Sequence, residues 1–251
     1  MLMKALHLEK IHPGLSIDCV VFGLHGDTLK VLILKLKKID KWALPGGFVA
    51  ATEAVDTEAA RMLKDRTGLD HLFLQQFHLF GAVDRNKVSD IRNFVDQQII
   101  SAAEGEVLAQ RFVTISYYAV VDYAKVQAPT PDYSSEFCEW CPLKELPSLI
   151  HDHREIIAKA YQVLKRDLNY QPIGYNLLPD KFTMPELQAV YETILEKKID
   201  RRNFRRKMLS FDILIATDEV RTGGSHKAPI LYKFDEQKYQ AAMVGGLVSL
   251  W

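Results

Sequence analysis

Basic side chains are concentrated in one stretch of this 251-residue chain. Residues 197–207, KKIDRRNFRRK, contain seven lysines and arginines and a single acid, Asp200. The whole chain has 32 basic and 32 acidic residues, so its formal net charge is zero and any electrostatic signal must be local. Such a run can contact phosphate groups, and Arg and Asn side chains can also form paired hydrogen bonds with guanine and adenine edges.

The basic stretch has the spacing of a helix that Asp200 caps and that runs through about Phe211. At about 100° per residue, Phe204, Met208 and Phe211 fall on one face of this helix. Arginines in the first turn oppose the helix dipole, which costs a few tenths of a kcal/mol each, so stability alone does not explain them. We interpret the opposite face as a DNA-binding surface. Its candidate contact residues are Arg201, Arg202, Asn203, Arg205, Arg206 and Lys207.

The neighbouring elements favour this interpretation. Thr183-Met-Pro-Glu186 is a capping box and predicts a helix before the basic one. Two strand-like runs, 212–220 and 229–235, follow it and are joined by a turn that contains Gly-Gly. With residues 151–168 or their end as the first helix, the order predicts a winged helix-turn-helix. Arg221, His226 and Lys227 of the hairpin are candidate phosphate contacts. The alternative is a solvated charged face, and for His226 an ordinary turn residue.

Glycine and charged residues in the N-terminal half follow a second pattern. Gly47 is followed after five residues by Glu53, and after seven more by Arg61, with Gly68 placed to end a helix at 53–67. Two strand-like runs, SIDCVVFGL and LKVLILKL, precede the turn WALPGG that contains Gly47. This frame resembles the Nudix box, in which a glycine loop leads into a helix whose carboxylates gather around Mg²⁺.

The carboxylates of that box are mostly absent. Met62 stands where the resemblance implies a glutamate, and Asp65-Arg66 stands where it implies a Glu-Glu pair. These positions share one helix face, so Arg66 places a cation where the metal charge would lie. We therefore predict neither catalytic residues nor a metal or cofactor. Glu58, one turn earlier, and Asp65 are expected to be solvent-exposed helix residues.

A degenerate Nudix domain followed by a winged helix resembles the Nudix-related transcriptional regulators over nearly the whole chain. The resemblance implies a mixed α/β Nudix domain with a mixed sheet at 1–150, a connecting helix and linker at 151–173, and a winged helix domain at 174–251. It also implies a homodimer that represses transcription from palindromic operator DNA and leaves it when a small ligand binds. That effector is either an ADP-ribose-type nucleotide or a pentose sugar such as arabinose, and the C-terminal sequence is closer to the sugar-responsive branch.

The effector pocket is expected near the glycine loop. Its candidate residues are Trp42, Gly46, Gly47, Arg85 and Tyr117. Trp42 could stack on a base or a sugar, or pack in the core; Arg85 could bind phosphate or a hydroxyl, or form a surface ion pair. For Tyr117 a place in the core is the favoured interpretation. Residues 86–110 are mostly helical in pattern and longer than the family usually has; they could reshape effector choice, add dimer contacts or be inert.

Two other functions remain open on the sequence. One is an active Mg²⁺-dependent pyrophosphohydrolase fused to a nucleic-acid-binding domain, which the missing carboxylates disfavour. The other is an RNA-binding adaptor, although no stacking platform of the RRM type is evident. The three cysteines and the absence of a signal-peptide pattern favour a cytoplasmic protein, and no apolar run is long enough for a membrane span.

Overall fold

The computed structural model describes residues 11–69, 74–126, 129–131, 134–168, 177–221 and 228–245. These form two compact units. The first unit comprises the described residues up to Gly23 together with Lys30–Tyr161, and the second comprises Leu24–Leu29 and the described residues from Gln162 onward. The division falls inside helix α4 (His153–Asp167), so this helix contributes to both units. None of the helices among the described residues is long and apolar enough to cross a membrane.

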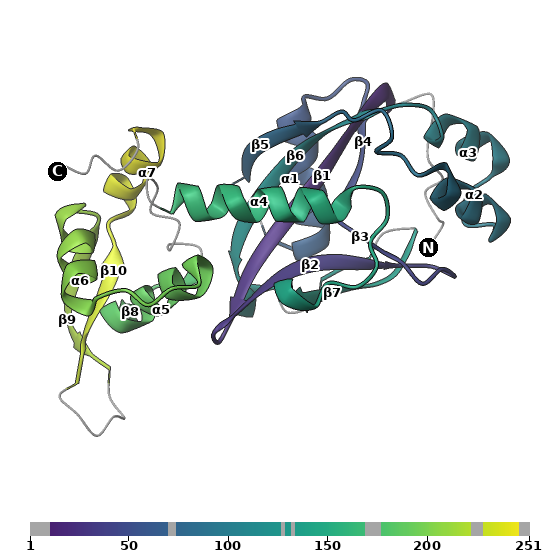
Figure 1. Ribbon diagram of the computed structural model, residues 1–251. Coiled ribbons are helices and arrows are strands. Elements are labelled where there is room, and N and C mark those ends of the chain that lie inside the picture. The colour runs from purple at the N-terminus through teal and green to yellow at the C-terminus, as the bar shows by residue number, and fades with distance from the viewer. Residues whose placement is uncertain are drawn as a thin grey trace. The chain divides into compact units, whose positions relative to one another are not determined.

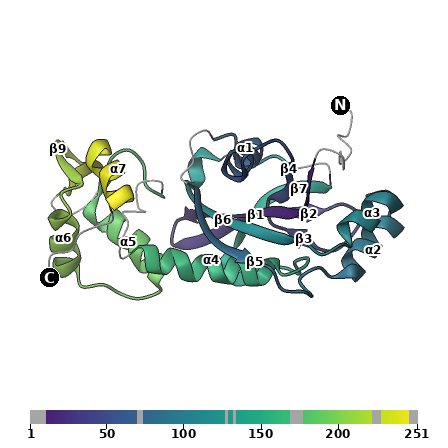
Figure 2. The same cartoon turned by 90° about the horizontal axis from the view of Figure 1, so that it is seen from above.

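The first unit is built on a seven-stranded sheet. Its strands are β1 (Ile11–His25), β2 (Thr28–Leu36), β3 (Trp42–Ala43), β4 (Gly46–Ala50), β5 (Leu74–Phe80), β6 (Val113–Asp122) and β7 (Ser135–Pro142). The order is β3-β2-β1-β6-β5, with β4 paired to β1 and β7 paired to β2. Helix α1 (Val55–Thr67) covers one face, and α4 up to Tyr161 covers the other (Figures 1 and 2). Short 3₁₀ turns follow β6 (Tyr123–Lys125) and β7 (Leu143–Glu145).

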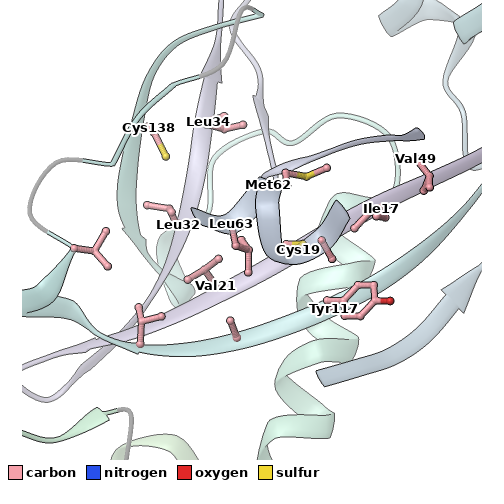
Figure 3. Packing of buried hydrophobic residues seen from close by; sticks show 14 residues of the cluster. Ile17, Cys19, Val21, Leu32, Leu34, Val49, Met62, Leu63, Tyr117 and Cys138 are labelled. Atoms are coloured by element: carbon pink, nitrogen blue, oxygen red, sulfur yellow. The ribbon is translucent and has the colours of Figure 1, made fainter. Parts of the chain in front are cut away.

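The alternation of side chains along β1 decides toward which face of the sheet each residue points. Ile17, Cys19 and Val21 are fully buried and pack with Met62 and Leu63 of α1 in the main core (Figure 3). The intervening side chains of β1 point to the opposite face, because successive residues of a strand alternate. The predicted end of α1 is confirmed: Gly68 adopts a left-handed conformation with φ of 70°, and its N–H donates to the Lys64 carbonyl.

The segment at 86–110 forms two helices, α2 (Val88–Asp96) and α3 (Ala102–Leu108), as the sequence predicted. Ser101 and Glu104 form a reciprocal capping box at the start of α3. Ile91, Phe94 and Ile100 are buried in a second apolar cluster with residues of the sheet. This segment is therefore packed into the domain.

The second unit has the predicted order of helices and hairpin. Its elements are β8 (Phe182–Thr183), α5 (Met184–Leu195), α6 (Arg201–Ser210), β9 (Leu214–Val220), β10 (Ile230–Phe234) and α7 (Glu236–Gly245). The strands form an antiparallel sheet of order β8-β10-β9. Thr183 and Asp200 cap α5 and α6 through their side chains, as expected. Helix α7 was not predicted from the sequence; its Tyr239 packs on Phe234 with ring centroids 5.6 Å apart.

Phe204 attaches α6 to the second unit, because only 4% of its surface is exposed and its ring lies 5.2 Å from that of Tyr191. We expect Phe204→Ala to lower the free energy of unfolding by about 3–5 kcal/mol. Arg206→Ala, on the exposed side of the same helix, should change it by less than about 0.5 kcal/mol. Thermal unfolding followed by circular dichroism measures both, and equal melting of the two variants would show that α6 is not held by this face.

Candidate nucleic-acid interface and effector cavity

Helix α6 presents its basic residues to solvent. Phe204 and Met208 are buried, which confirms the predicted docking face, whereas Phe211 at the end of the helix is only partly buried. The six residues of α6 that were predicted to contact DNA are all exposed: Arg201, Arg202, Asn203, Arg205, Arg206 and Lys207. Helix α6 therefore has one buried apolar face and one exposed polar face.

The arginines of α6 lack acidic partners within the described residues. Arg206 donates to the Asn203 side chain over 3.1 Å, and Arg205 donates to the Tyr232 hydroxyl over 3.4 Å. These contacts orient the guanidinium groups and leave their charge uncompensated. An exposed, uncompensated cationic face is what a polyanion would stabilise.

Arg221 has a different environment from the residues of α6. It donates two hydrogen bonds of 2.8 Å to the Glu186 carboxylate, which also accepts from the Thr183 N–H in the capping box of α5. Burial raises the pKa of the Glu186 carboxyl. The hydrogen bonds from Thr183 and Arg221 lower it by a larger amount, so the pKa lies below its usual range. Arg221 thus joins the hairpin to α5. His226 and Lys227, the other predicted hairpin contacts, lie outside the described residues.

On α1, the residues of the degenerate Nudix box differ in burial. Met62 is 7% exposed and packs in the apolar cluster, so a glutamate at this position would be buried. The expectation that Glu58 is solvent-exposed is wrong: it is 3% exposed and pairs with Arg61. Burial is the main cause that raises the pKa of Glu58; Arg61 opposes this effect and a hydrogen bond with Glu53 adds to it. Asp65 is exposed, as predicted.

No group of three His, Cys, Asp or Glu side chains in the described part of the chain is placed to hold a metal ion. Arg61 contacts two of the three acids of α1, Glu58 and Asp65, and the third, Asp56, accepts a hydrogen bond from the Tyr117 hydroxyl. Ion pairs between side chains of the same helix therefore occupy the part of α1 where a Nudix box has its metal ligands.

A cavity of about 160 Å³ lies beside β1 and the Gly46-Gly47 turn. Ser16 and Asp18 of β1 line it, and they alternate with Ile17 and Cys19, which pack against α1. The structure brings together three of the five predicted pocket residues: Gly46, Gly47 and Arg85 all line this cavity. Helices α2 and α3 form part of its wall, so the 86–110 segment does border the pocket.

The other two predicted pocket residues do not line the cavity. Trp42 packs edge-on against Phe137, with ring centroids 5.5 Å apart, and the Lys35 amine lies 5.6 Å from its ring. Tyr117 is 3% exposed in the core, as favoured from the sequence, and its hydroxyl donates to Asp56.

The polar end of the cavity is a buried charge cluster that sequence reasoning did not find. Arg85 is 4% exposed, so its ion pair is internal rather than at the surface. It donates to Asp152 over 3.0 and 2.9 Å, and its Nη2 lies 3.4 Å from Asp18. The pattern HDHRE at 151–155 and the acid in SIDCVV were the available signals, but nothing local connects them.

His153 completes this cluster as a neutral imidazole. Its Nδ1 accepts from the Leu44 N–H over 2.9 Å, and its Nε2 lies 3.4 Å from the Asp18 carboxylate. Burial lowers the pKa of His153 to about 4, and burial likewise lowers the pKa of the adjacent His151 to about 4. Burial also raises the pKa of Asp18, although Arg85 opposes the effect.

Comparison with known proteins matches both halves of the chain. The model of the NUDIX domain matches residues 12–164, and the model of the NrtR DNA-binding winged helix domain matches residues 174–234. The chain is 28% identical, over 90% of its length and 84% of the relative's, to the ADPR responsive transcriptional repressor NtrR of Acinetobacter baylyi. It is 27% identical, over 59% of its length and 72% of the relative's, to an ADP-ribose pyrophosphatase of Methanocaldococcus jannaschii.

Solved structures show the same two-part architecture. Shewanella oneidensis NrtR in complex with a 27mer DNA superimposes with a TM-score of 0.71 at 28% identity, covering 90% of this chain and 95% of that one. A MutT/nudix family protein from Enterococcus faecalis has the same fold, with a TM-score of 0.64 at 24% identity over 89% of this chain and 87% of its own.

The buried position of Met62 can be tested by restoring the carboxylate of the box. Met62→Glu would place a charge in the apolar core, and we expect it to lower the free energy of unfolding by on the order of 3 kcal/mol. Met62→Leu, which keeps volume and polarity, should cost less than about 1.5 kcal/mol. Urea unfolding compares the two, and equal costs would contradict the core position of this side chain.

The two buried histidines predict a pH dependence of stability. Because their folded pKa values of about 4 lie below the unfolded value of about 6.5, their contribution is complete above pH 6.5 and is lost as the pH falls toward 4. Urea unfolding at about pH 7 and about pH 5 should show this loss, reduced in His153→Gln. The exposed His78 provides the control, since His78→Gln should retain the wild-type loss. An unchanged loss in His153→Gln would contradict the assignment.

Proposed function

The chain belongs to the NUDIX domain family and carries an NrtR-type winged helix domain, and from this we propose that it is a ligand-responsive transcriptional repressor. The observation that carries the proposal is α6: a helix anchored by Phe204 and Met208 that exposes arginines without acidic partners in the described structure. Binding to an operator also requires access to the chromosome, which supports the cytoplasmic location expected from the sequence.

Double-stranded DNA is the partner that this helix fits. Arg201, Arg202, Arg205, Arg206 and Lys207 would neutralise phosphates or reach guanine edges, and Asn203 could reach adenine. The major groove admits one α-helix, and a two-fold dimer would present two copies of α6 to successive grooves of a palindromic site. Arg221 is bound to Glu186, so its role would be to hold the hairpin in place rather than to supply a free charge.

The effector is proposed to be a nucleotide of the ADP-ribose type that binds to the first unit. The relative from Acinetobacter is named for its response to ADPR, and the relative from Methanocaldococcus is an ADP-ribose pyrophosphatase, so both names favour this nucleotide over a pentose. A ligand changes DNA affinity only as far as it binds the free and DNA-bound states differently. Release from DNA therefore requires that the nucleotide binds the DNA-free form more tightly.

Hydrolysis is a second candidate function, because of the likeness to the pyrophosphatase. The side chains of α1 oppose it. Met62 is in the core, Arg66 stands where the Nudix box implies an acid, and Arg61 pairs with Glu58 and Asp65. Without several carboxylates on one face, a divalent cation has no ligand set there. We therefore propose a sensor without turnover.

The test is a fluorescence-anisotropy titration of the full chain with duplex DNA from its own upstream region, at fixed salt. The titration is made without ligand, with ADP-ribose and with L-arabinose. Selective binding that ADP-ribose releases supports the proposal, and release by L-arabinose alone would replace the effector. Binding that neither ligand alters removes both effectors, and no selective binding removes the repressor function. Mg²⁺-dependent consumption of ADP-ribose would favour the hydrolase.

Two variants separate the role of α6 from general charge. Arg202→Ala and Arg206→Ala should each weaken binding and lower the slope of log K against log salt by about 1, as expected for one lost phosphate contact. Arg92→Ala removes an equal charge from the exposed surface of α2 and should leave both quantities unchanged. Wild-type affinity in both α6 variants would show that another surface binds DNA.

A further inference from the structure

Helix α6 has three apolar side chains, and one of them is not part of its buried face. Phe204 and Met208 are 4% and 3% exposed, whereas Leu209 is 41% exposed. With 3.6 residues per turn, Leu209 lies about 100° around the helix from Met208 but only about 20° from Arg202. Leu209 therefore belongs to the cationic face of α6 rather than to the face that packs on the domain.

On this face, Leu209 is a neighbour of two arginines. Side chains of a helix lean toward its N-terminus, so Leu209 covers the surface beside Arg205 and Arg206, which are four and three positions earlier. Both arginines are exposed. The Arg205 guanidinium donates to the Tyr232 hydroxyl over 3.4 Å, and the Arg206 guanidinium donates to the Asn203 side chain over 3.1 Å. Neither contact covers the leucine, which stays open to a partner between two cations.

The stability of the second unit does not explain a leucine at this position. The hydrophobic effect stabilises a side chain in proportion to the apolar area that is removed from water, and much of Leu209 remains in water. A partner that covers this face must offer anionic groups to the arginines and an apolar group to the leucine. The major groove of DNA offers both, because phosphates line its edges and the C5-methyl group of thymine projects into it.

The spacing along α6 fits the spacing of base pairs. Each residue of a helix rises 1.5 Å, so Leu209 lies about 4.5 Å along the axis from Arg206. Successive base pairs of DNA are about 3.4 Å apart. Leu209 can therefore reach the base pair next to the one that Arg206 contacts.

From these observations we propose that Leu209 is a specificity-determining residue that packs on the C5-methyl group of a thymine in the operator. This inference rests on the proposed repressor function and adds a base-specific contact to it. The thymine lies beside the base pair that Arg206 contacts, and each half-site of a two-fold operator contains one such thymine. The arginines supply most of the affinity, and the leucine distinguishes thymine from the other bases at its position.

The test removes the methyl group from the DNA and leaves the protein intact. Each thymine of the selected operator duplex is replaced in turn by deoxyuridine, which lacks only the C5-methyl group, and binding of the full chain is measured by fluorescence anisotropy at fixed salt. At one thymine position in each half-site, the wild-type protein should bind about fourfold more weakly for each methyl group removed.

Two leucine variants identify the residue that contacts the methyl group. Leu209→Ala should bind the thymine and uracil duplexes equally at that position. It should keep the wild-type slope of log K against log salt, because no charge is removed. Leu79→Ala changes a leucine of the first unit that is 51% exposed, and it should keep the wild-type preference for thymine. Circular dichroism checks that both variants are folded.

Three results would overturn the inference while the repressor function stands. The first is selective binding that uracil does not weaken at any position. The second is a uracil effect that persists undiminished in folded Leu209→Ala, since another residue would then contact the methyl group. The third is a lower salt slope in Leu209→Ala, which would show that the leucine acts by placing the arginines. If the wild-type protein does not select the unmodified duplex, the repressor function itself fails, and this inference fails with it.

Discussion

The buried ion pair of Arg85 is the constraint on which the first unit depends. It connects Asp18 in β1, the residue stretch after β5 and Asp152 at the start of α4. Removing one member would leave a buried charge uncompensated, at a cost of about 3–5 kcal/mol, so these three elements must keep their places. The same pair explains the first glycine of the Gly46-Gly47 turn. A Cβ at position 46 would lie 2.6 Å from the Asp18 carboxylate and 2.7 Å from the Ile17 carbonyl oxygen.

The second glycine connects this turn to the loss of the metal site. A Cβ at position 47 would lie 3.2 Å from the end of Met62, so the loop and the helix are packed together where the Nudix box places a glutamate. Met62 lies in the apolar core at this position, and the buried Glu58 one turn earlier pairs with Arg61. The fold and its glycine loop are thus present although Met62 and Arg66 stand where the resemblance to the Nudix box implies glutamates.

The second unit divides stability and recognition between two faces of one helix. Phe204 and Met208 hold α6 by burial, and the arginines contribute nothing comparable to its stability. Arg221 also forms an exposed ion pair with Glu186 of the capping box of α5, which links the hairpin to that helix. The cationic face is therefore carried on a framework whose own polar groups are satisfied. Its charge is available to a partner, since no acid of the described structure neutralises it.

The sequence by itself determined the elements whose signals are local. The caps at Thr183 and Asp200, the left-handed Gly68, the face of α6 and the Nudix frame were all readable, because each depends on residues a few positions apart. Tertiary structure alone decided the rest. Glu58 is buried, Trp42 lies off the cavity and Arg85 joins acids at positions 18 and 152, each through partners distant in the chain. Burial and ion pairing depend on which segments the sheet brings together. The spacing of residues along the chain does not show which segments these are.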